Sequence, residues 1–171
     1  RLDTLVNNAG VALLGPVENA PLDEWEQMVR VNVLGLLYTT HAALPHLLTA
    51  AAGAPRRVAD LVNISSTAGR VARSGGGVYN VTKFGVVAFS ESLRQEVTRR
   101  HVRVAVVEPG YVATELQTHV REEVRQETLR FLSGVEPLAA EDIADAIQYI
   151  VTRPRRVAVN ELLIRPAEQE A

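Results

Sequence analysis

The sequence predicts an α/β fold in which a parallel sheet carries helices on both faces. Short apolar runs rich in Val, Ile and Leu alternate with longer segments of helical periodicity, and this alternation is typical of βαβ units. Four runs predict buried strands: Leu2–Val6, Ala59–Ile64, Val102–Val107 and Val157–Ile164. Because each connection crosses back over the sheet, we expect neighbouring strands to be parallel.

Three longer stretches predict the main helices. The first runs from about Leu22 to Ala52, with a break near Val31–Val33 and a kink at Pro45, which has no backbone N–H to donate. The second runs from about Gly77 to Arg100. The third covers about Ala139 to Thr152 and places its apolar residues on one face.

Composition excludes several classes of protein. The length of 171 residues fits one domain over residues 1–171, and 47% hydrophobic with 22% charged residues is ordinary for a globular protein. A net charge of −2 gives no reason to expect nucleic acid or an anionic membrane as partner. The absence of cysteine excludes disulfides, thiol catalysis and zinc–thiolate sites. The four histidines show no metal-ligand spacing, so no metal is expected.

Targeting signals are not visible, and we therefore expect a cytoplasmic protein. The segment Val33–Ala52 has no charged residue and is long enough to cross a bilayer. It also carries histidines, threonines and a proline, which a membrane-spanning helix would have to bury in lipid. A helix packed between the sheet and a partner subunit is the better interpretation.

Polar turns follow three of the predicted strands. Asn7–Gly10 comes after the first strand, Ser65–Gly69 after the second and Glu108–Tyr111 after the third. Open parallel sheets bind ligands in the crevice beyond the carboxyl ends of their strands. Three such turns at the same edge therefore predict one shared site.

Lys83 is the only lysine in the chain, and Tyr79 stands four residues before it. On a helix these two positions share a face. A phenol beside an ammonium ionises more easily, because the cation stabilises the phenolate. The pair therefore fits a tyrosine that acts as an acid and base near neutral pH. Taken alone, it fits equally well a surface tyrosine that packs on an aliphatic stem.

These residues together resemble the short-chain dehydrogenase/reductase family over essentially the whole chain. The shared elements are an NNAG turn (Asn7–Gly10), an Asn in a V-N-x-x-G context (Asn32), a Ser thirteen residues before the Tyr (Ser66), a Y-x-x-x-K pair (Tyr79, Lys83) and a P-G-x-x-x-T loop (Pro109, Gly110, Thr114). The resemblance implies a Rossmann-like, doubly wound parallel sheet. Segments such as Leu14–Glu18 look most like an NADP-dependent subgroup that includes 3-hydroxy acid dehydrogenases and clavulanate-type aldehyde reductases.

The resemblance also implies a role for each catalytic position. Tyr79 would give a proton to the substrate carbonyl oxygen, or take one from the alcohol. Lys83 would lower the pKa of that phenol and bind the nicotinamide ribose, and Ser66 would hydrogen-bond the substrate oxygen. Asn32 would hold a water that links Lys83 to solvent, although an Asn here could instead cap or kink a helix. Ser65 is expected to be a structural neighbour of Ser66.

The implied cofactor is NADP, with NAD not excluded. The residues expected to bind it are Asn8, Ala9, Gly10, Tyr79, Lys83, Pro109, Gly110, Val112 and Thr114. The Thr114 hydroxyl and the Val112 backbone would hold the carboxamide. Tyr111 and Arg70 face the expected substrate region, but ordinary surface positions explain them equally well.

The chain departs from the family in one respect. The nucleotide-binding turn T-G-x-x-x-G-x-G is absent, and Gly75–Gly77 does not replace it because no strand precedes it. In the family the first βαβαβ portion lies before the NNAG turn. We therefore expect an N-terminally truncated sheet with four of the usual strands and an open apolar edge at Leu2–Val6. The chain alone is expected to bind cofactor poorly and to be inactive.

Three functions remain open from the sequence. The first is the catalytic part of an NADP-dependent oxidoreductase that acts on a carbonyl or secondary alcohol. The second is a non-catalytic fragment that retains only an oligomerisation role. The third is an epimerase or dehydratase relative that shares the Tyr and Lys, which the NNAG turn and the Ser–Tyr spacing disfavour. Helices 33–52 and 79–100 are apolar enough to form a homodimer or homotetramer.

The substrate is not specified by the sequence. In the family, the segment Thr114–Pro137 would form a lid over the substrate, and here it mixes arginine with glutamate. Three arginines in it either meet a substrate carboxylate or form exposed pairs with nearby glutamates. These arginines are Arg121, Arg125 and Arg130, and the glutamates are Glu122, Glu123 and Glu127.

Overall fold

The computed structural model describes residues 1–116, 120–131 and 133–170. Its core is one parallel sheet of four strands in the order β1-β2-β3-β4. The strands are β1 (Thr4–Asn7), β2 (Ala59–Ile64), β3 (Val102–Pro109) and β4 (Glu161–Ile164). The α-helices are α1 (Leu22–Met28), α2 (Leu36–Ala52), α3 (Gly77–Val97), α4 (Glu122–Phe131) and α5 (Ala140–Val151).

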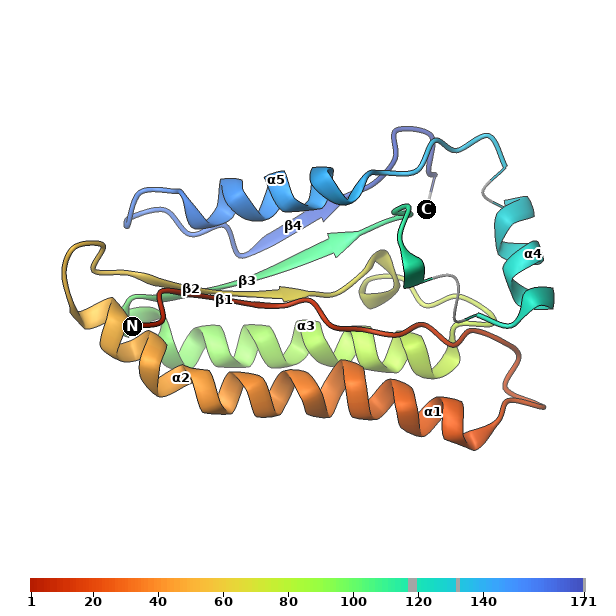
Figure 1. Ribbon diagram of the computed structural model, residues 1–171, viewed down its shortest axis with the longest axis horizontal. Helices are drawn as coiled ribbons and strands as arrows, with labels where there is room; N and C mark the ends of the chain where they lie inside the picture. The colour runs from red at the N-terminus through yellow and green to blue at the C-terminus, as the bar shows by residue number, and fades with distance from the viewer. Residues whose placement is uncertain (117–119, 132, 171) are drawn as a thin grey trace.

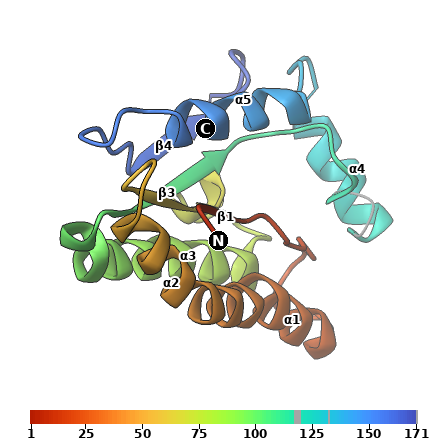
Figure 2. The same ribbon diagram turned by 60° about the vertical axis from the view of Figure 1, so that its left-hand side comes forward.

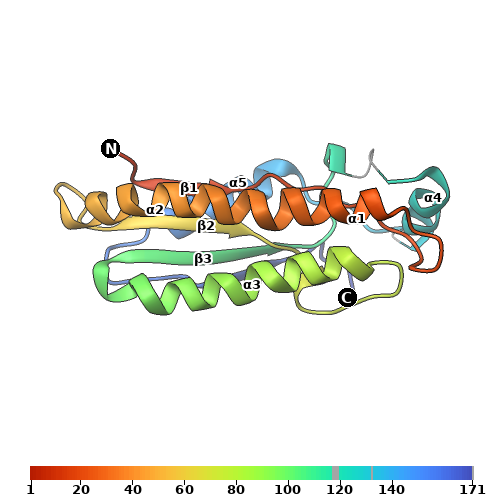
Figure 3. The same ribbon diagram turned by 90° about the horizontal axis from the view of Figure 1, so that it is seen from below.

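Helices cover both faces of the sheet, which confirms the predicted architecture. Helix α5 lies on one face, and α1, α2 and α3 lie on the other (Figure 1). Seen from below, α2 and α3 run side by side along the strands (Figure 3). Strand β1 pairs only with β2 among the described residues, and Val6 on it is 37% exposed. The predicted open apolar edge is therefore present at β1.

Two apolar cores hold these layers together. Adjacent residues of a strand point to opposite faces, so Leu61 and Val62 of β2 enter different cores. Leu61 packs with Leu47 of α2 and Leu93 of α3, whereas Val62 packs with Ile150 of α5. Burial on both faces explains why β2 and β3 read as continuous apolar runs in the sequence.

The long first helix changes geometry where the sequence predicts a break. A π-helical segment, Val29–Gly35, joins α1 to α2, and Asn32 in it is buried. Wider turns of this kind occur mostly as single-turn bulges and often at functional sites. Helix α2 continues through Pro45, where a kink was expected. Short 3₁₀ turns follow β2 (Thr67–Gly69) and α3 (Thr98–Arg100).

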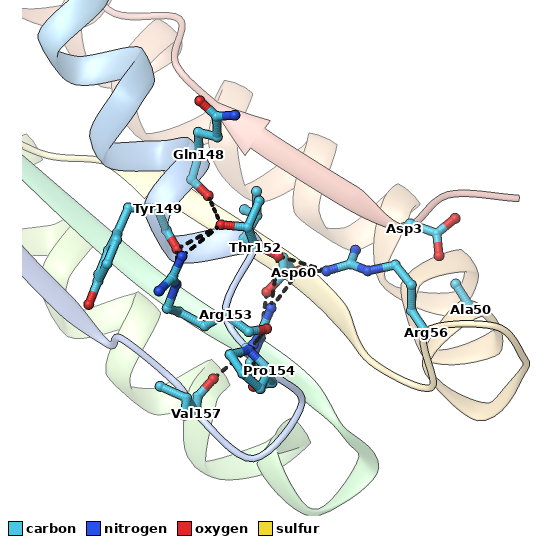
Figure 4. A network of polar contacts seen from close by, with 12 residues as sticks. Asp3, Ala50, Arg56, Asp60, Gln148, Tyr149, Thr152, Arg153, Pro154 and Val157 are labelled. Carbon is cyan, nitrogen blue, oxygen red and sulfur yellow. Dashed lines mark hydrogen bonds and ion pairs between the residues drawn. The ribbon is translucent and has the colours of Figure 1, made fainter.

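A buried ion pair fastens α5 to the sheet near the amino ends of the strands. Arg103 of β3 donates from Nε to Oδ1 of Asp60 at 2.7 Å and from Nη2 to Oδ2 at 3.0 Å. Its Nη1 also donates to the carbonyls of Arg153 and Val157, which follow the end of α5. Figure 4 shows Arg153, Pro154 and Val157 in the turn beside Asp60. Nη2 of Arg103 also donates to the carbonyl of Val151, the last residue of α5, at 3.2 Å, so the guanidinium satisfies one orphan carbonyl at the end of the helix.

This turn also explains why β4 is shorter than predicted. The sequence favoured a strand from Val157, but pairing with β3 begins at Glu161. The N–H of Val157 donates instead to the carbonyl of Pro154 at 2.8 Å. Residues that belong to this turn cannot also join the ladder.

Helix α4 stands at one end of the molecule, beyond the carboxyl ends of the strands (Figure 2). It lies within the long connection for which the sequence indicated only partial helical pattern. Across the described ranges, no helix is both long and apolar enough to pass through a membrane.

Candidate active site

A cavity of about 940 Å³ opens at the carboxyl ends of the strands. The turns after β1, β2 and β3 all contribute to its wall, as the sequence predicted. Every residue expected to bind cofactor lines it: Asn8, Ala9, Gly10, Tyr79, Lys83, Pro109, Gly110, Val112 and Thr114. Ser66 lines it as well, whereas Asn32 lies behind the wall.

Tyr79 and Lys83 enter the cavity from the first turns of α3. The Lys83 Nζ atom lies 5.7 Å from the centroid of the Tyr79 ring. Lys83 is buried, and its Nζ donates to the carbonyl of Ile64 at 3.1 Å. Burial disfavours the charged ammonium and lowers the pKa of Lys83 to about 8. The pair therefore faces the cavity and is not a surface contact.

The pKa of Tyr79 differs from the expected direction. Burial raises the pKa of the Tyr79 phenol, and a hydrogen bond with the Ser66 side chain opposes part of that rise. The sequence predicted a lowered pKa through Lys83. In the structure the ammonium lies near the ring and bonds a backbone carbonyl, so desolvation of the phenol has the larger effect.

Ser66 and Ser65 have different surroundings. The Ser66 hydroxyl caps the 3₁₀ turn after β2, because its Oγ accepts from the N–H of Ala68 at 3.1 Å. Ser65 is buried, and its Oγ donates to the backbone carbonyl of Lys83 at 3.0 Å. Ser65 thus ties the end of β2 to α3, whereas Ser66 lies at the cavity beside Tyr79.

Asn32 links three segments behind the cavity. Its Oδ1 accepts from the N–H of Val11 at 2.8 Å, and its Nδ2 donates to the Val11 carbonyl at 2.9 Å and to Thr82 Oγ1 at 3.2 Å. A Cβ atom built on Gly10 would lie 3.5 Å from Asn32 Oδ1 and 3.7 Å from Lys83 Nζ. Asn32 therefore fixes the turn after β1 close to the lysine.

The loop after β3 is held by the C-terminal segment. The N–H of Gly110 donates to the carbonyl of Ile164 at 2.8 Å, and the N–H of Tyr111 donates to Oε1 of Gln169 at 2.9 Å. Val112 pairs with Leu138 in an isolated parallel bridge. These contacts shape the wall that Pro109–Thr114 was expected to form.

Some contributors to the site were not expected from the sequence. Helix α5 supplies Ala140, Ile143 and Ile147 to the cavity wall, but their spacing indicated only a core-facing stripe. Arg70 is not free to meet a ligand, because its guanidinium bonds Glu108 and Glu161. A glutamate at the end of an apolar strand was the one signal that could have indicated this contact.

Known proteins with similar sequences are dehydrogenases and reductases. The model of the short chain dehydrogenase family matches residues 1–125. Serine 3-dehydrogenase of Rhizobium radiobacter is 39% identical over 170 residues, which cover 98% of this chain and 65% of that protein. Sulfoacetaldehyde reductase 2 of Chromohalobacter salexigens is 40% identical over 171 residues, which cover 99% of this chain and 66% of that protein.

Solved structures agree with this placement. A closed form of serine dehydrogenase in complex with NADP⁺ superposes with a TM-score of 0.88 at 35% identity, over 99% of this chain and 66% of that one. The serine dehydrogenase of Escherichia coli gives a TM-score of 0.79 at 34% identity, over 99% and 66%. The chain thus spans about two thirds of the length of these relatives. It belongs to the short-chain dehydrogenase/reductase family.

Proposed function

We propose that this chain is the catalytic part of an NADP-dependent oxidoreductase that interconverts a carbonyl and a secondary or primary alcohol. The observation that carries this proposal is the meeting of Ser66, Tyr79 and Lys83 in one cavity. Relatives at 39% and 40% identity that are named serine 3-dehydrogenase and sulfoacetaldehyde reductase support it. A purely structural fragment would have no need of this constellation.

The cavity fits the nicotinamide half of such a cofactor. Its volume of about 940 Å³ lies within the usual range for small-molecule sites, roughly 300–1,000 Å³. An ammonium has three donors, and the Ile64 carbonyl takes one from Lys83, which leaves others for ribose hydroxyls. Bound NADP(H) would accept or donate the hydride. Complexes of relatives with NADP⁺ favour NADP, and NAD remains the alternative.

Tyr79 is the proposed general acid and base. During reduction its phenol would donate a proton to the carbonyl oxygen, while the Ser66 hydroxyl donates a hydrogen bond to that oxygen. Burial raises the pKa of Tyr79, which keeps the phenol protonated as a proton donor must be. A protonated Lys83 close to the ring favours phenolate, so the pair is suited to move one proton in either direction.

The test uses the protein as it occurs in its source. NADPH oxidation is followed with a panel of short aldehydes and ketones, and the reverse reaction with the corresponding alcohols. Replacement of Tyr79 by Phe should lower kcat by ~10²–10⁴-fold, because one proton transfer is lost. Binding of NADP⁺ should persist in this variant, which separates loss of chemistry from loss of the fold. Full activity of Tyr79→Phe would contradict the assigned role.

Self-association is a second part of the proposal. The outer faces of α2 and α3 expose Tyr38, Val81 and Phe84 at 68%, 67% and 41%. Apolar side chains on adjacent helices favour a homodimer or homotetramer through these helices. Light scattering should therefore give twice or four times the protomer mass, and Val81→Glu should reduce it. We also propose a cytoplasmic location, which cell fractionation tests.

A further inference from the structure

Arg70 connects two segments that form the wall of the cavity. It directly follows the 3₁₀ turn Thr67–Gly69, which the Ser66 hydroxyl caps. Its Nε donates to Oε2 of Glu108 at 2.6 Å, and Glu108 directly precedes Pro109 at the end of β3. Ser66 and Pro109 both line the cavity. One guanidinium thus joins the turn after β2 to the loop after β3.

The arginines of the expected lid form pairs of another kind. Nη2 of Arg125 lies 2.5 Å from Oε2 of its helix neighbour Glu122, which is the local pairing that the sequence offered as one possibility. Nε of Arg121 lies 3.6 Å from Oε1 of Glu24 on α1. The side chains of two other expected partners lie outside the described residues, namely those of Glu123 and Glu127. None of the four paired residues is in the cavity wall or next to a residue with a proposed catalytic role.

Glu108 is a rigid anchor for Arg70. Its strand, β3, is paired with β2 on one side and with β4 on the other, and its side chain is fully buried. A second carboxylate, that of Glu161 on β4, accepts from Nη2 of Arg70 at 2.6 Å. The Glu161 side chain is 53% exposed, so this outer contact is expected to hold the guanidinium less firmly. The position of Arg70 therefore depends mainly on Glu108.

The turn that Arg70 follows is also fastened to α3. Ser65 Oγ donates to the backbone carbonyl of Lys83 at 3.0 Å, and a Cβ atom on Gly69 would lie 2.9 Å from that carbonyl oxygen. Within the turn, Ser66 Oγ accepts from the N–H of Ala68 at 3.1 Å, and the Ser66 carbonyl accepts from the N–H of Gly69 at 2.9 Å. The turn is therefore a compact unit with two anchors, one on α3 and one at the end of β3.

The position of this turn determines where the Ser66 hydroxyl meets the substrate oxygen. In the proposed reaction Ser66 donates to that oxygen, and the loop from Pro109 to Thr114 holds the nicotinamide. A donor of this kind acts at about 2.7–3.1 Å from the oxygen. A misplacement of about 1 Å can lower the rate ~10²-fold. A tie between the turn and the loop therefore fixes the substrate oxygen relative to the atom that carries the hydride.

We propose that Arg70 is a positioning residue, which holds the Ser66 turn through Glu108 at a fixed distance from the loop that receives the nicotinamide. Arg70 itself lies outside the cavity wall and acts through Ser66. The inference rests on the proposed function and adds a residue to its machinery.

The main experiment is a double-mutant cycle of Arg70→Met and Ser66→Ala in the protein as it occurs in its source. With Ser66 present, Arg70→Met should lower kcat by ~10-fold or more, because the hydroxyl is displaced from the substrate oxygen. In the Ser66→Ala background the same change should lower kcat by less than ~2-fold, since nothing is left to position. KM for NADP⁺ should change little, because Ile164 and Gln169 still hold the loop. An equal loss of kcat in both backgrounds would overturn the proposal.

Three further variants test whether the contact with Glu108 is the one that matters. Arg70→Lys keeps a cation that can reach Glu108 without the planar fork, and should restore part of the lost kcat. Glu161→Gln changes only the outer contact and should leave kcat within ~2-fold. Arg94→Met is the matched control, because it breaks a 2.6 Å pair with Glu91 whose residues are outside the cavity wall. The proposal is wrong if either control lowers kcat as much as Arg70→Met does.

A variant without either partner guards against loss of the fold. Arg70→Met alone leaves the Glu108 carboxylate buried and deprived of its partner, which is destabilising. Arg70→Met combined with Glu108→Met replaces the pair by apolar side chains, and such replacements are often neutral for stability. This double variant should unfold at a urea concentration close to that of the unmodified protein and still show the lowered kcat. Full kcat in the folded double variant would count against the positioning role.

Hydrogen exchange keeps the test independent of turnover. The N–H groups of residues 68–71 all donate within the turn, so their exchange reports its opening. Arg70→Met should speed exchange in a peptide of residues 66–71 and leave a peptide of residues 84–94 unchanged. If no alcohol or carbonyl is turned over but this local change is found, the proposed function fails and the tie between Arg70 and the turn stands. If turnover is found and Arg70→Met leaves kcat unchanged, the positioning role fails and the proposed function stands.

Discussion

The Nε atom of Arg70 lies 2.6 Å from Oε2 of Glu108, whose side chain is fully buried at the end of β3. Nη2 of the same arginine lies 2.6 Å from Oε2 of Glu161 on β4. Oε1 of Glu108 is buried and has no hydrogen-bond partner within the described part of the chain. Of the two oxygens of the Glu108 carboxylate, Oε2 therefore has a partner and Oε1 has none among the described residues. Burial raises the pKa of Glu108, and the hydrogen bond and charge of Arg70 only partly oppose that rise.

Glu108→Gln should remove a pH dependence from the stability. A carboxyl whose pKa is higher in the folded protein binds more protons when folded, so its contribution is present at low pH and is lost as the pH rises above its ordinary value of 4.5. The unmodified protein should therefore lose stability relative to Glu108→Gln between about pH 4.5 and neutrality. Urea unfolding of both proteins across this range tests the direction in which stability changes with pH. A difference that is constant with pH would contradict the raised pKa.

The buried pair of Arg103 and Asp60 should contribute more to stability than any exposed ion pair. Arg103→Met would leave the Asp60 carboxylate buried with only Arg56 as ion-pair partner, and would free the carbonyls that follow α5. Breaking a buried pair in this way costs about 3–5 kcal/mol. The loss is measured as the difference in the free energy of unfolding between Arg103→Met and the unmodified protein, with Arg99→Met as an exposed control. A loss below about 1 kcal/mol would show that the turn after α5 holds without the guanidinium.

Much of the fold was predictable because its signals are local. Apolar runs of four to eight residues identify strands, and the strongly apolar β2 matched its predicted bounds, Ala59–Ile64. Strand ends depend on tertiary contacts, and these are not visible in a run of residues. Val157 has the character of a strand residue, but Arg103, far away in the sequence, holds its carbonyl in a turn.

The site shows the same division. Tyr79 and Lys83 were found from their spacing on one helix, and Ser66 from the resemblance to the family. The direction of the pKa shift of Tyr79 was not predicted correctly, because it depends on how much water the folded protein removes from the phenol. The guanidinium of Arg121 packs against Gly15, and this contact joins two loops whose approach no local pattern encodes.

Replacing each of the two adjacent serines by alanine should affect a different property of the protein. Ser65→Ala removes the hydrogen bond from Oγ to the Lys83 carbonyl, and should lower the free energy of unfolding by ~1 kcal/mol with little change in kcat. Ser66→Ala should instead lower kcat by ~10²-fold or more, because the substrate oxygen loses a donor. Parallel unfolding and kinetic measurements on both variants compare them. Equal effects on kcat would mean that the assignment of Ser66 over Ser65 is wrong.

Lys83 offers a direct measurement of its own titration, because the chain contains no other lysine. Protein grown with ¹³C-labelled lysine should show one side-chain Cε signal, and its chemical shift should titrate with a midpoint of about 8, below the ordinary 10.5. Tyr79→Phe serves as a control for the neighbouring phenol. A lysine whose pKa is lowered on folding binds fewer protons when folded, so stability should rise with pH between about 8 and 10.5. A midpoint above 10 would place the ammonium in contact with water and remove the physical basis for its role beside Tyr79.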